Sequence, residues 1–306
     1  MRSYHERPNY RHPSKVDFFL FTIPLLVGNI FQQFYNIVDM IIVGQTIGKE
    51  ALAAVGATGS ITFLIIGFAQ GLTAGLSIIT AQRFGAQDFR GVKKSFAVAI
   101  IISFTVTAIL TVLSLVFLRP LLLLMQTPPD IIQQAQEFIC VILGGMFASM
   151  AFNLLSNMIR ALGDSRTPLF LLIFAVIINV ILDLVFIINF HMGIAGAGYA
   201  TVIAQISASL MCVIYIKRKI PLLQVSKSDF KIDKDTIFTH LNAGLPMAFQ
   251  SSIIAIGAVV LQSALNSLGT DVVAAQAAAG RIDQFATQPM MSSVVRSLYL
   301  LNSLPI

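Results

Sequence analysis

The stretch Ser95–Leu118, SFAVAIIISFTVTAILTVLSLVFL, runs for 24 residues without a charged side chain. A helix of about 20 apolar residues crosses the hydrocarbon core of a bilayer, so this stretch predicts a transmembrane span. The whole chain has the same character, with 56% hydrophobic and only 11% charged residues. A soluble domain carries about 25% charged residues. The composition therefore excludes an ordinary soluble globular protein and indicates a membrane protein.

Seven further segments are apolar enough, or nearly so, to cross a membrane. The first of them, 18–43, is too long for a secretory signal and lacks a small-residue cleavage site, so we predict that it is retained. The spacing predicts an all-α fold, a polytopic membrane helix bundle. The eight predicted spans are 18–43, 51–80, 95–118, 131–159, 168–190, 194–216, 237–266 and 272–295.

The distribution of basic residues predicts the orientation. Sixteen Lys and Arg residues fall in the N-terminal segment and the loops on its side, against two on the other side, Lys49 and Arg119. Such a bias places the basic side in the cytoplasm. We therefore expect a multi-pass protein of the plasma (inner) membrane with a cytoplasmic N-terminus. The net charge is +6, and the basic residues lie between apolar runs and do not form one surface. The expected partner is therefore the lipid bilayer, and no nucleic acid is expected.

An internal repeat suggests two related halves. The segment 47–61, IGKEALAAVGATGSI, matches 268–282, LGTDVVAAQAAAGRI, at six of fifteen positions. Six spans separate the two copies, so both enter from the same side, as in transporters with parallel repeats. We predict a cytoplasmic segment (1–16), a six-helix lobe (17–220), a cytoplasmic linker (221–235) and the first two helices of a second lobe (236–306). The residues after Met291 do not follow the first copy, and we interpret the chain as an incomplete copy of a two-lobed protein.

Two acidic residues lie well inside the first six spans, Asp39 and Asp183. Because a buried charge is costly in lipid, such residues usually mark an ion or substrate pathway. Asp39, Asp183 and Thr201 all fall about 8–10 Å from the outer ends of their helices, at 1.5 Å per residue. Asn179 precedes Asp183 by one helical turn and shares its face. We therefore predict a hydrated cavity inside the first six helices.

Three stretches of this sequence resemble the multidrug and toxic compound extrusion (MATE) family. They are Asn36–Asp39 continuing through Val43-Gly44 to Ala51–Ala54, the loop Gln82–Lys94 (QRFGAQDFRGVKK), and the loop Ile159–Pro168 (IRALGDSRTP). The resemblance extends from Phe18 to about Met291. It implies a secondary active exporter that antiports Na⁺ or H⁺ against amphipathic, often cationic organic compounds, without a cofactor and without enzymatic activity.

The resemblance also implies roles for particular residues. Asp39, Asn179, Asp183 and Thr201 match the positions that bind the coupling cation in this family, and the Ala197 carbonyl resembles a further ligand. Oxygen donors of this kind suit Na⁺, and the acids alone could carry protons. Pro24 resembles the bend of the first helix. Asp283 is a candidate group of the second lobe.

Four further polar residues on the first and fourth spans have two interpretations. They either line the cavity or join helices by hydrogen bonds. They are Gln33, Asn36, Asn153 and Asn157.

Two other functions remain open at this point. One is a flippase for lipid-linked oligosaccharides with a related architecture, and the other is a fragment that transports nothing. We expect a monomer and no metal beyond Na⁺ at the cation site. The four histidines, at 5, 12, 191 and 240, are expected at termini and loop edges, where they form no metal constellation.

Overall fold

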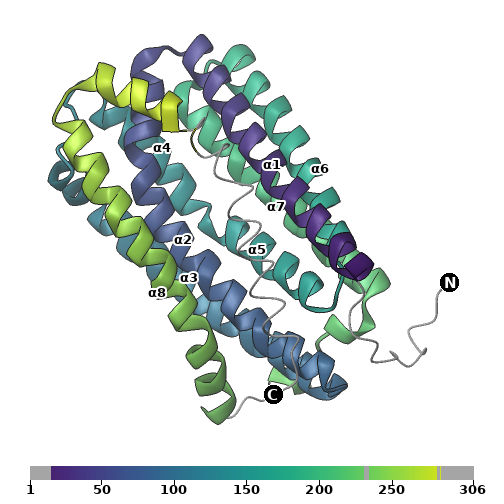
Figure 1. Ribbon diagram of the computed structural model, residues 1–306. Coiled ribbons are helices and arrows are strands. Elements are labelled where there is room, and N and C mark those ends of the chain that lie inside the picture. Colours follow the sequence, from purple (N-terminus) through teal and green to yellow (C-terminus); the bar gives the residue numbers. More distant parts are fainter. Residues whose placement is uncertain (1–14, 231–233, 281–282, 284–306) are drawn as a thin grey trace.

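The computed structural model describes residues 15–230, 234–280 and 283, and within these residues every regular element is a helix. Figure 1 shows long helices packed roughly along a common axis. In chain order they are α1 (Lys15–Thr46), α2 (Lys49–Gly85), α3 (Phe89–Leu124), α4 (Ile132–Gly144), α5 (Met146–Ala161), α6 (Arg166–Leu184), the π-helix η1 (Val185–Asn189), α7 (Gly193–Lys219), the 3₁₀ turns η2 (Pro221–Leu223) and η3 (Lys227–Phe230), and α8 (Lys234–Asn266). A further helix occupies 270–280.

The helices confirm the predicted fold class. Five of the described helices are long and apolar enough to cross a membrane, and the bent pair α4–α5 makes six. They are α2, α3, α6 with η1, α7 and α8. The helix α1 covers the first predicted span. The eighth predicted span, 272–295, lies largely outside the described residues.

The fourth predicted span is broken, and the sequence expectation of one continuous helix is wrong there. The chain bends by 47° between α4 and α5, at Gly145. A Cβ atom added at Gly145 would lie 2.1 Å from Cγ2 of Val202 in α7. Glycine therefore allows α7 to approach the bend closely, and glycine is a common cause of sharp kinks.

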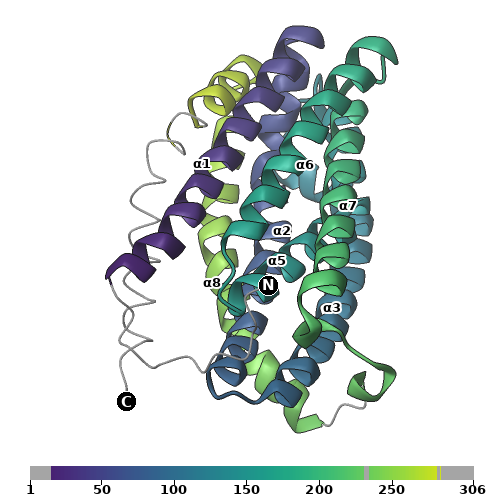
Figure 2. The same cartoon turned by 90° about the vertical axis from the view of Figure 1, so that its right-hand side faces the viewer.

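The first and the last long helices run in the same direction through the bundle. Figures 1 and 2 show α1 and α8 both rising from the end that holds the α2–α3 loop. We call this the basic end, because Arg83, Arg90 and the last turn of α7 lie there. Helix α1 packs mainly against α6, whereas α2 contacts α3, α4, α5 and α8. This direction agrees with two parallel repeats.

Buried apolar side chains form two separate cores. One lies toward the basic end and includes Leu76, Phe96 and Met158, together with α6 residues up to Ala175. The other lies toward the opposite end and includes Ile61 and Ile139, together with helix positions from Ile187 onward. Val180 of α6 also packs against this second core, so Asp183, which lies between Val180 and Ile187 in the chain, is at the level of that core.

The internal repeat is visible in the backbone. Gly48 precedes α2 with φ +122°, and its counterpart Gly269 precedes the helix 270–280 with φ +96°. L-residues with a side chain rarely adopt such values, whereas glycine adopts them readily. Both copies therefore use glycine at the same turn for the same reason.

The segment expected to link the lobes contains η2 and η3. Leu223 of η2 is buried, and both turns pack against α3. Asp229 accepts hydrogen bonds from the backbone and the hydroxyl of Ser226, and these bonds lower the pKa of its carboxyl group. Residues 231–233 lie outside the described residues, so the domain boundaries stay a prediction.

Candidate cation site

The helices α6 and α7 form the site because a short turn joins them side by side. Asn179 and Asp183 share one face of α6, one turn apart, and Thr201 comes from the facing side of α7. Asn179 is 1% exposed and Asp183 is 0% exposed. The structure thus brings three of the predicted residues together at the level of the second apolar core.

The amide of Asn179 connects the two helices. In the orientation that gives the amide nitrogen an acceptor and the amide oxygen a donor, Nδ2 of Asn179 donates to Oδ2 of Asp183 at 2.8 Å. Oδ1 accepts from the backbone N–H of Thr201 at 3.0 Å. One side chain therefore orients the Asp183 carboxylate and fixes it relative to α7.

Asp39 on α1 completes the pair of acids. Its carboxyl group repels that of Asp183 and is within hydrogen-bonding contact of it. Two carboxyl groups in hydrogen-bonding contact do not both remain ionised without a cation, so we expect them to share a proton or a metal ion. Within the described chain, no donor hydrogen-bonds to Oδ1 of Asp183. An orphaned buried oxygen of this kind calls for a ligand.

Thr201 and Ala197 form the other side of the site. The Thr201 hydroxyl donates to the Ala197 carbonyl at 3.1 Å. The hydroxyl of Tyr35 lies 3.2 Å from the same oxygen of Thr201. Since Thr201 already donates to Ala197, Tyr35 is the donor to Thr201. The Ala197 carbonyl thus already has a donor, and its predicted role as a cation ligand stays a prediction.

Tyr35 is a site residue that the sequence reasoning missed. It precedes Asp39 by four residues, so the two share one face of α1. That spacing was the available signal. A tyrosine in an apolar helix is most simply explained by packing, and its hydroxyl partner on α7 is 166 residues away in the chain.

The other predicted residues lie around the site or away from it. The Asn36 amide donates to Gln33 at 3.5 Å, within α1. Asn153 donates to the carbonyl of Ser149 in its own helix. Asn157 donates to Thr73 of α2 at 3.2 Å, which is the helix-joining alternative.

Two other predicted residues, Pro24 and Asp283, lie toward the two ends of the described chain. Pro24 lies within α1, and its side chain is outside the described part. Asp283 is exposed at the end of the described residues.

Comparisons with known proteins agree on one family. The MatE family model matches residues 24–185. The chain is 32% identical over 276 residues to the probable multidrug resistance protein YpnP of Bacillus subtilis. This alignment covers 90% of the chain and 61% of YpnP. It is 24% identical to the multidrug export protein MepA of Staphylococcus saprophyticus, of which it covers 59%. The chain thus spans about three fifths of the length of these relatives.

Solved structures give the same result. An outward-facing multidrug resistance MATE family transporter superposes with a TM-score of 0.82 at 27% identity, covering 92% of this chain and 63% of that chain. An inward-facing one superposes with a TM-score of 0.80 at 27% identity, covering 87% of this chain and 60% of that chain. With these matches added to the helical bundle and its paired acids, the chain belongs to the MATE family of membrane transporters.

Proposed function

We propose that Asp39, Asn179, Asp183 and Thr201 bind the coupling cation of a multidrug exporter. The cation is Na⁺ or H⁺, and the exported compounds are amphipathic and often cationic. The exporter works in the plasma (inner) membrane with its N-terminus in the cytoplasm. The observation that carries this proposal is the contact between the buried Asp183 carboxyl group and that of the part-buried Asp39, at the level of an apolar core.

The chemistry of the site favours a small cation. Carboxylate, hydroxyl and carbonyl oxygens are hard ligands suited to Na⁺, and the same acids accept a proton. A flippase for pyrophosphate lipids would instead need basic donors around the phosphates. The acids and the amide that line this site are the opposite of such a lining, so we favour the exporter.

Exchange follows from the sharing of one pair of acids. A cation entering between Asp39 and Asp183 removes their repulsion and stabilises the arrangement in which α1 lies against α6. An organic cation that binds to the same carboxylates competes with the coupling cation. Binding of one then shifts the conformational equilibrium that releases the other.

A binding experiment tests the site without requiring transport. Purified 306-residue chain is titrated with Na⁺ at alkaline pH by calorimetry, and the proton release on binding is measured in weak buffer. We expect saturable binding that Asp183→Asn and Asp39→Asn each abolish. Glu137→Gln, an exposed acid on α4, serves as the matched control and leaves binding unchanged. Equal binding by all four proteins would refute the cation site.

A transport experiment tests the exporter. The chain is reconstituted in liposomes, and efflux of ethidium is followed under separate Na⁺ and H⁺ gradients. Gradient-driven efflux that Asp183→Asn removes supports antiport and identifies the ion. Cation binding without efflux under either gradient would assign the 306-residue chain a binding lobe that does not transport alone.

A further inference from the structure

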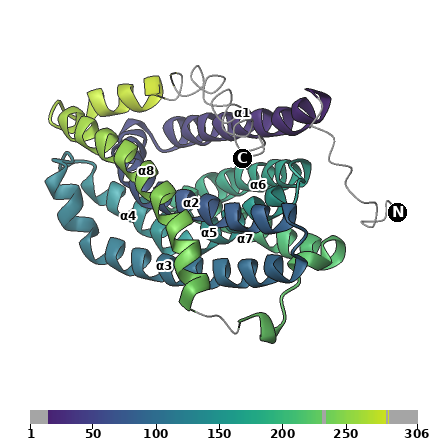
Figure 3. The same ribbon diagram turned by 60° about the horizontal axis from the view of Figure 1, so that its bottom comes forward.

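Helix α8, the first helix of the second repeat, lies directly against α2. Figures 1 and 3 show the two helices side by side. A Cβ atom added at Gly71 of α2 would lie 2.5 Å from the Met247 carbonyl, and one added at Gly75 would lie 2.5 Å from the Ala243 carbonyl. From α8, a Cβ atom added at Gly244 would lie 2.9 Å from Cδ1 of Leu72. The two backbones therefore approach each other as near as glycine allows.

At the basic end a buried polar chain joins α8 to α2 and α3. Nε2 of His240 lies 2.7 Å from the Ser95 hydroxyl, which lies 2.9 Å from the hydroxyl of Thr80. All three side chains are completely buried. The sequence expectation that His240 sits at a loop edge is wrong, because α8 begins six residues earlier and turns the ring into the bundle.

The directions of these hydrogen bonds follow from the chemistry of the groups. Nδ1 of His240 lies 2.7 Å from the Thr236 carbonyl, which can only accept, so Nδ1 carries a proton. In the neutral ring Nε2 is then the acceptor, and Ser95 donates to it while receiving from Thr80. Both ring nitrogens are satisfied, and no described carboxylate forms an ion pair with the ring.

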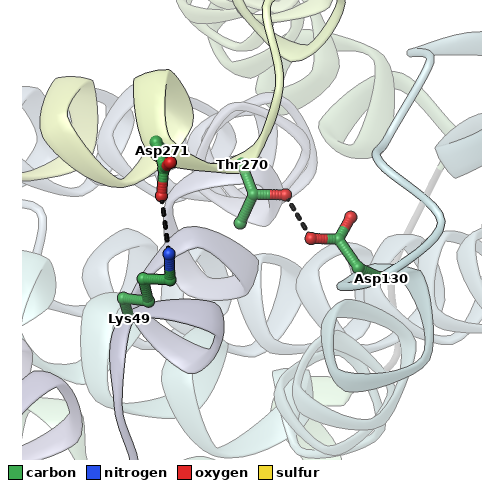
Figure 4. A network of polar contacts seen from close by, with 4 residues as sticks. All are labelled: Lys49, Asp130, Thr270 and Asp271. Carbon is green, nitrogen blue, oxygen red and sulfur yellow. Dashed lines mark hydrogen bonds and ion pairs between the residues drawn. The ribbon is translucent and has the colours of Figure 1, made fainter.

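At the opposite end three more contacts join the start of the second repeat to the first six helices. The buried amide of Asn266 donates to the Met125 carbonyl at 2.9 Å. Figure 4 shows Thr270 bonded to Asp130 and Lys49 paired with Asp271 at 3.0 Å. Helix α8 is thus held at both of its ends as well as along its length.

We propose that His240 is a positioning residue that fixes α8 to α2 and α3, so that α8 moves with the first six helices during transport. The boundary of motion then falls after α8 and does not coincide with the boundary of the repeat in the sequence. This inference rests on the proposed transport function for its meaning. Its structural content, a fixed α8, is measurable whether or not the chain transports.

Spin labels on both sides of the polar chain test the proposal. Arg90→Cys in α3 and Thr239→Cys in α8 are exposed positions, labelled in a Cys140→Ala background because Cys212 is buried. Distances are measured by pulsed electron paramagnetic resonance in liposomes. With His240 intact we expect one narrow distance distribution, the same with and without saturating Na⁺ and at acid and alkaline pH.

Variants of the polar chain separate positioning from general folding. His240→Leu removes both ring nitrogens and should at least double the width of the distribution. His240→Gln keeps an acceptor for Ser95 and should restore the narrow distribution. Ser95→Ala removes the donor to Nε2 and the acceptor of the Thr80 hydroxyl but keeps the bond from Nδ1 to Thr236, so it should give an intermediate width. Each protein is compared at equal helicity and equal elution volume, so misfolded samples are recognised.

Two results would overturn the proposal. One is a narrow distribution in His240→Leu and Ser95→Ala equal to that of the unsubstituted chain. The other is a label distance that changes with Na⁺ or pH while His240 is intact, because α8 would then move relative to α3. Calorimetric Na⁺ binding on the same samples reports on the cation site separately. Absence of Na⁺ binding together with an unchanged label distance would count against the proposed function alone.

Discussion

Asn179 does two things at once in the cation site. Its amide donates to Asp183 and accepts from the backbone of Thr201. The Tyr35 hydroxyl contacts a neutral group, the hydroxyl of Thr201. A hydrogen bond to a charged group contributes about 1.5–3 kcal/mol, and one between neutral groups about 0.5–1.5 kcal/mol. The two residues should therefore differ measurably in their effect on cation binding.

Asn179→Ala should weaken Na⁺ binding more than Tyr35→Phe does. Loss of the amide leaves Oδ2 of Asp183 without its donor, and we expect Na⁺ affinity to fall about 10- to 100-fold. Tyr35→Phe removes the neutral hydrogen bond to Thr201, which should lower Na⁺ affinity about tenfold or less. Calorimetric titration of both variants provides the comparison. The reverse order would show that Tyr35 contacts the cation directly.

Two signals predicted most residues of the candidate site: the energetic cost of an acid in lipid, and helical spacing. Asp39 and Asp183 are acids in apolar helices, Asn179 lies one turn from Asp183, and Thr201 lies at the same depth. The contact of the two carboxyl groups follows from that agreement in depth. Tyr35 and His240 could not be predicted in the same way, because an amphipathic ring is compatible with packing and with hydrogen bonding alike. Their partners on distant helices decide between the two.

The bend between α4 and α5 lies beside the site. Val202, which packs into the space left by Gly145, follows Thr201 directly. Any group added at Gly145 must displace α7 or the side chain of Val202. The bend therefore determines how closely the Thr201 side of the site approaches α6.

Gly145→Ala should destabilise the protein, whereas Gly144→Ala should not. The added methyl group at Gly145 would overlap Val202, and such overpacking costs about 1–3 kcal/mol. No described atom lies within 4 Å of a Cβ at Gly144. Thermal unfolding in detergent, followed by circular dichroism, measures the difference. Val202→Ala combined with Gly145→Ala should recover most of the loss, and failure to do so would locate the strain elsewhere.

The contact between α2 and α8 has its own matched pair of glycines. Gly71→Ala would place a methyl group against the Met247 backbone and should lower stability by about 1–3 kcal/mol. Gly59→Ala, on the same helix, meets no described atom within 4 Å. It should leave stability unchanged or raise it by about 0.5–1 kcal/mol, since alanine favours a helix. Equal melting temperatures for the two variants would contradict the close packing of α8.

The order and the apolar character of the helices were predictable because lipid demands long apolar helices. The interruptions were not. The bend at Gly145 depends on Val202 of another helix, and the π-helix Val185–Asn189 just after Asp183 interrupts an apolar run that shows no turn residue. Hydropathy along a single stretch contains neither feature.

The orientation of the whole bundle in the membrane gives a prediction of its own. Gln87 lies in the α2–α3 loop at the basic end, and Asp271 lies at the opposite end with its side chain 82% exposed. In intact cells we expect a membrane-impermeant maleimide to label Asp271→Cys but not Gln87→Cys. After permeabilisation both should react. The Cys140→Ala background serves as the control, and labelling of Gln87→Cys in intact cells would invert the orientation.

The paired glycine turns at Gly48 and Gly269 bear on how such a protein could arise. Six crossings separate the two turns, an even number, so a gene segment copied in tandem re-enters the bilayer in the orientation of its parent. The duplicate needs no redistribution of its charged loops to insert correctly. Side chains in the two copies were then free to diverge, whereas a backbone turn that only glycine tolerates kept its residue in both.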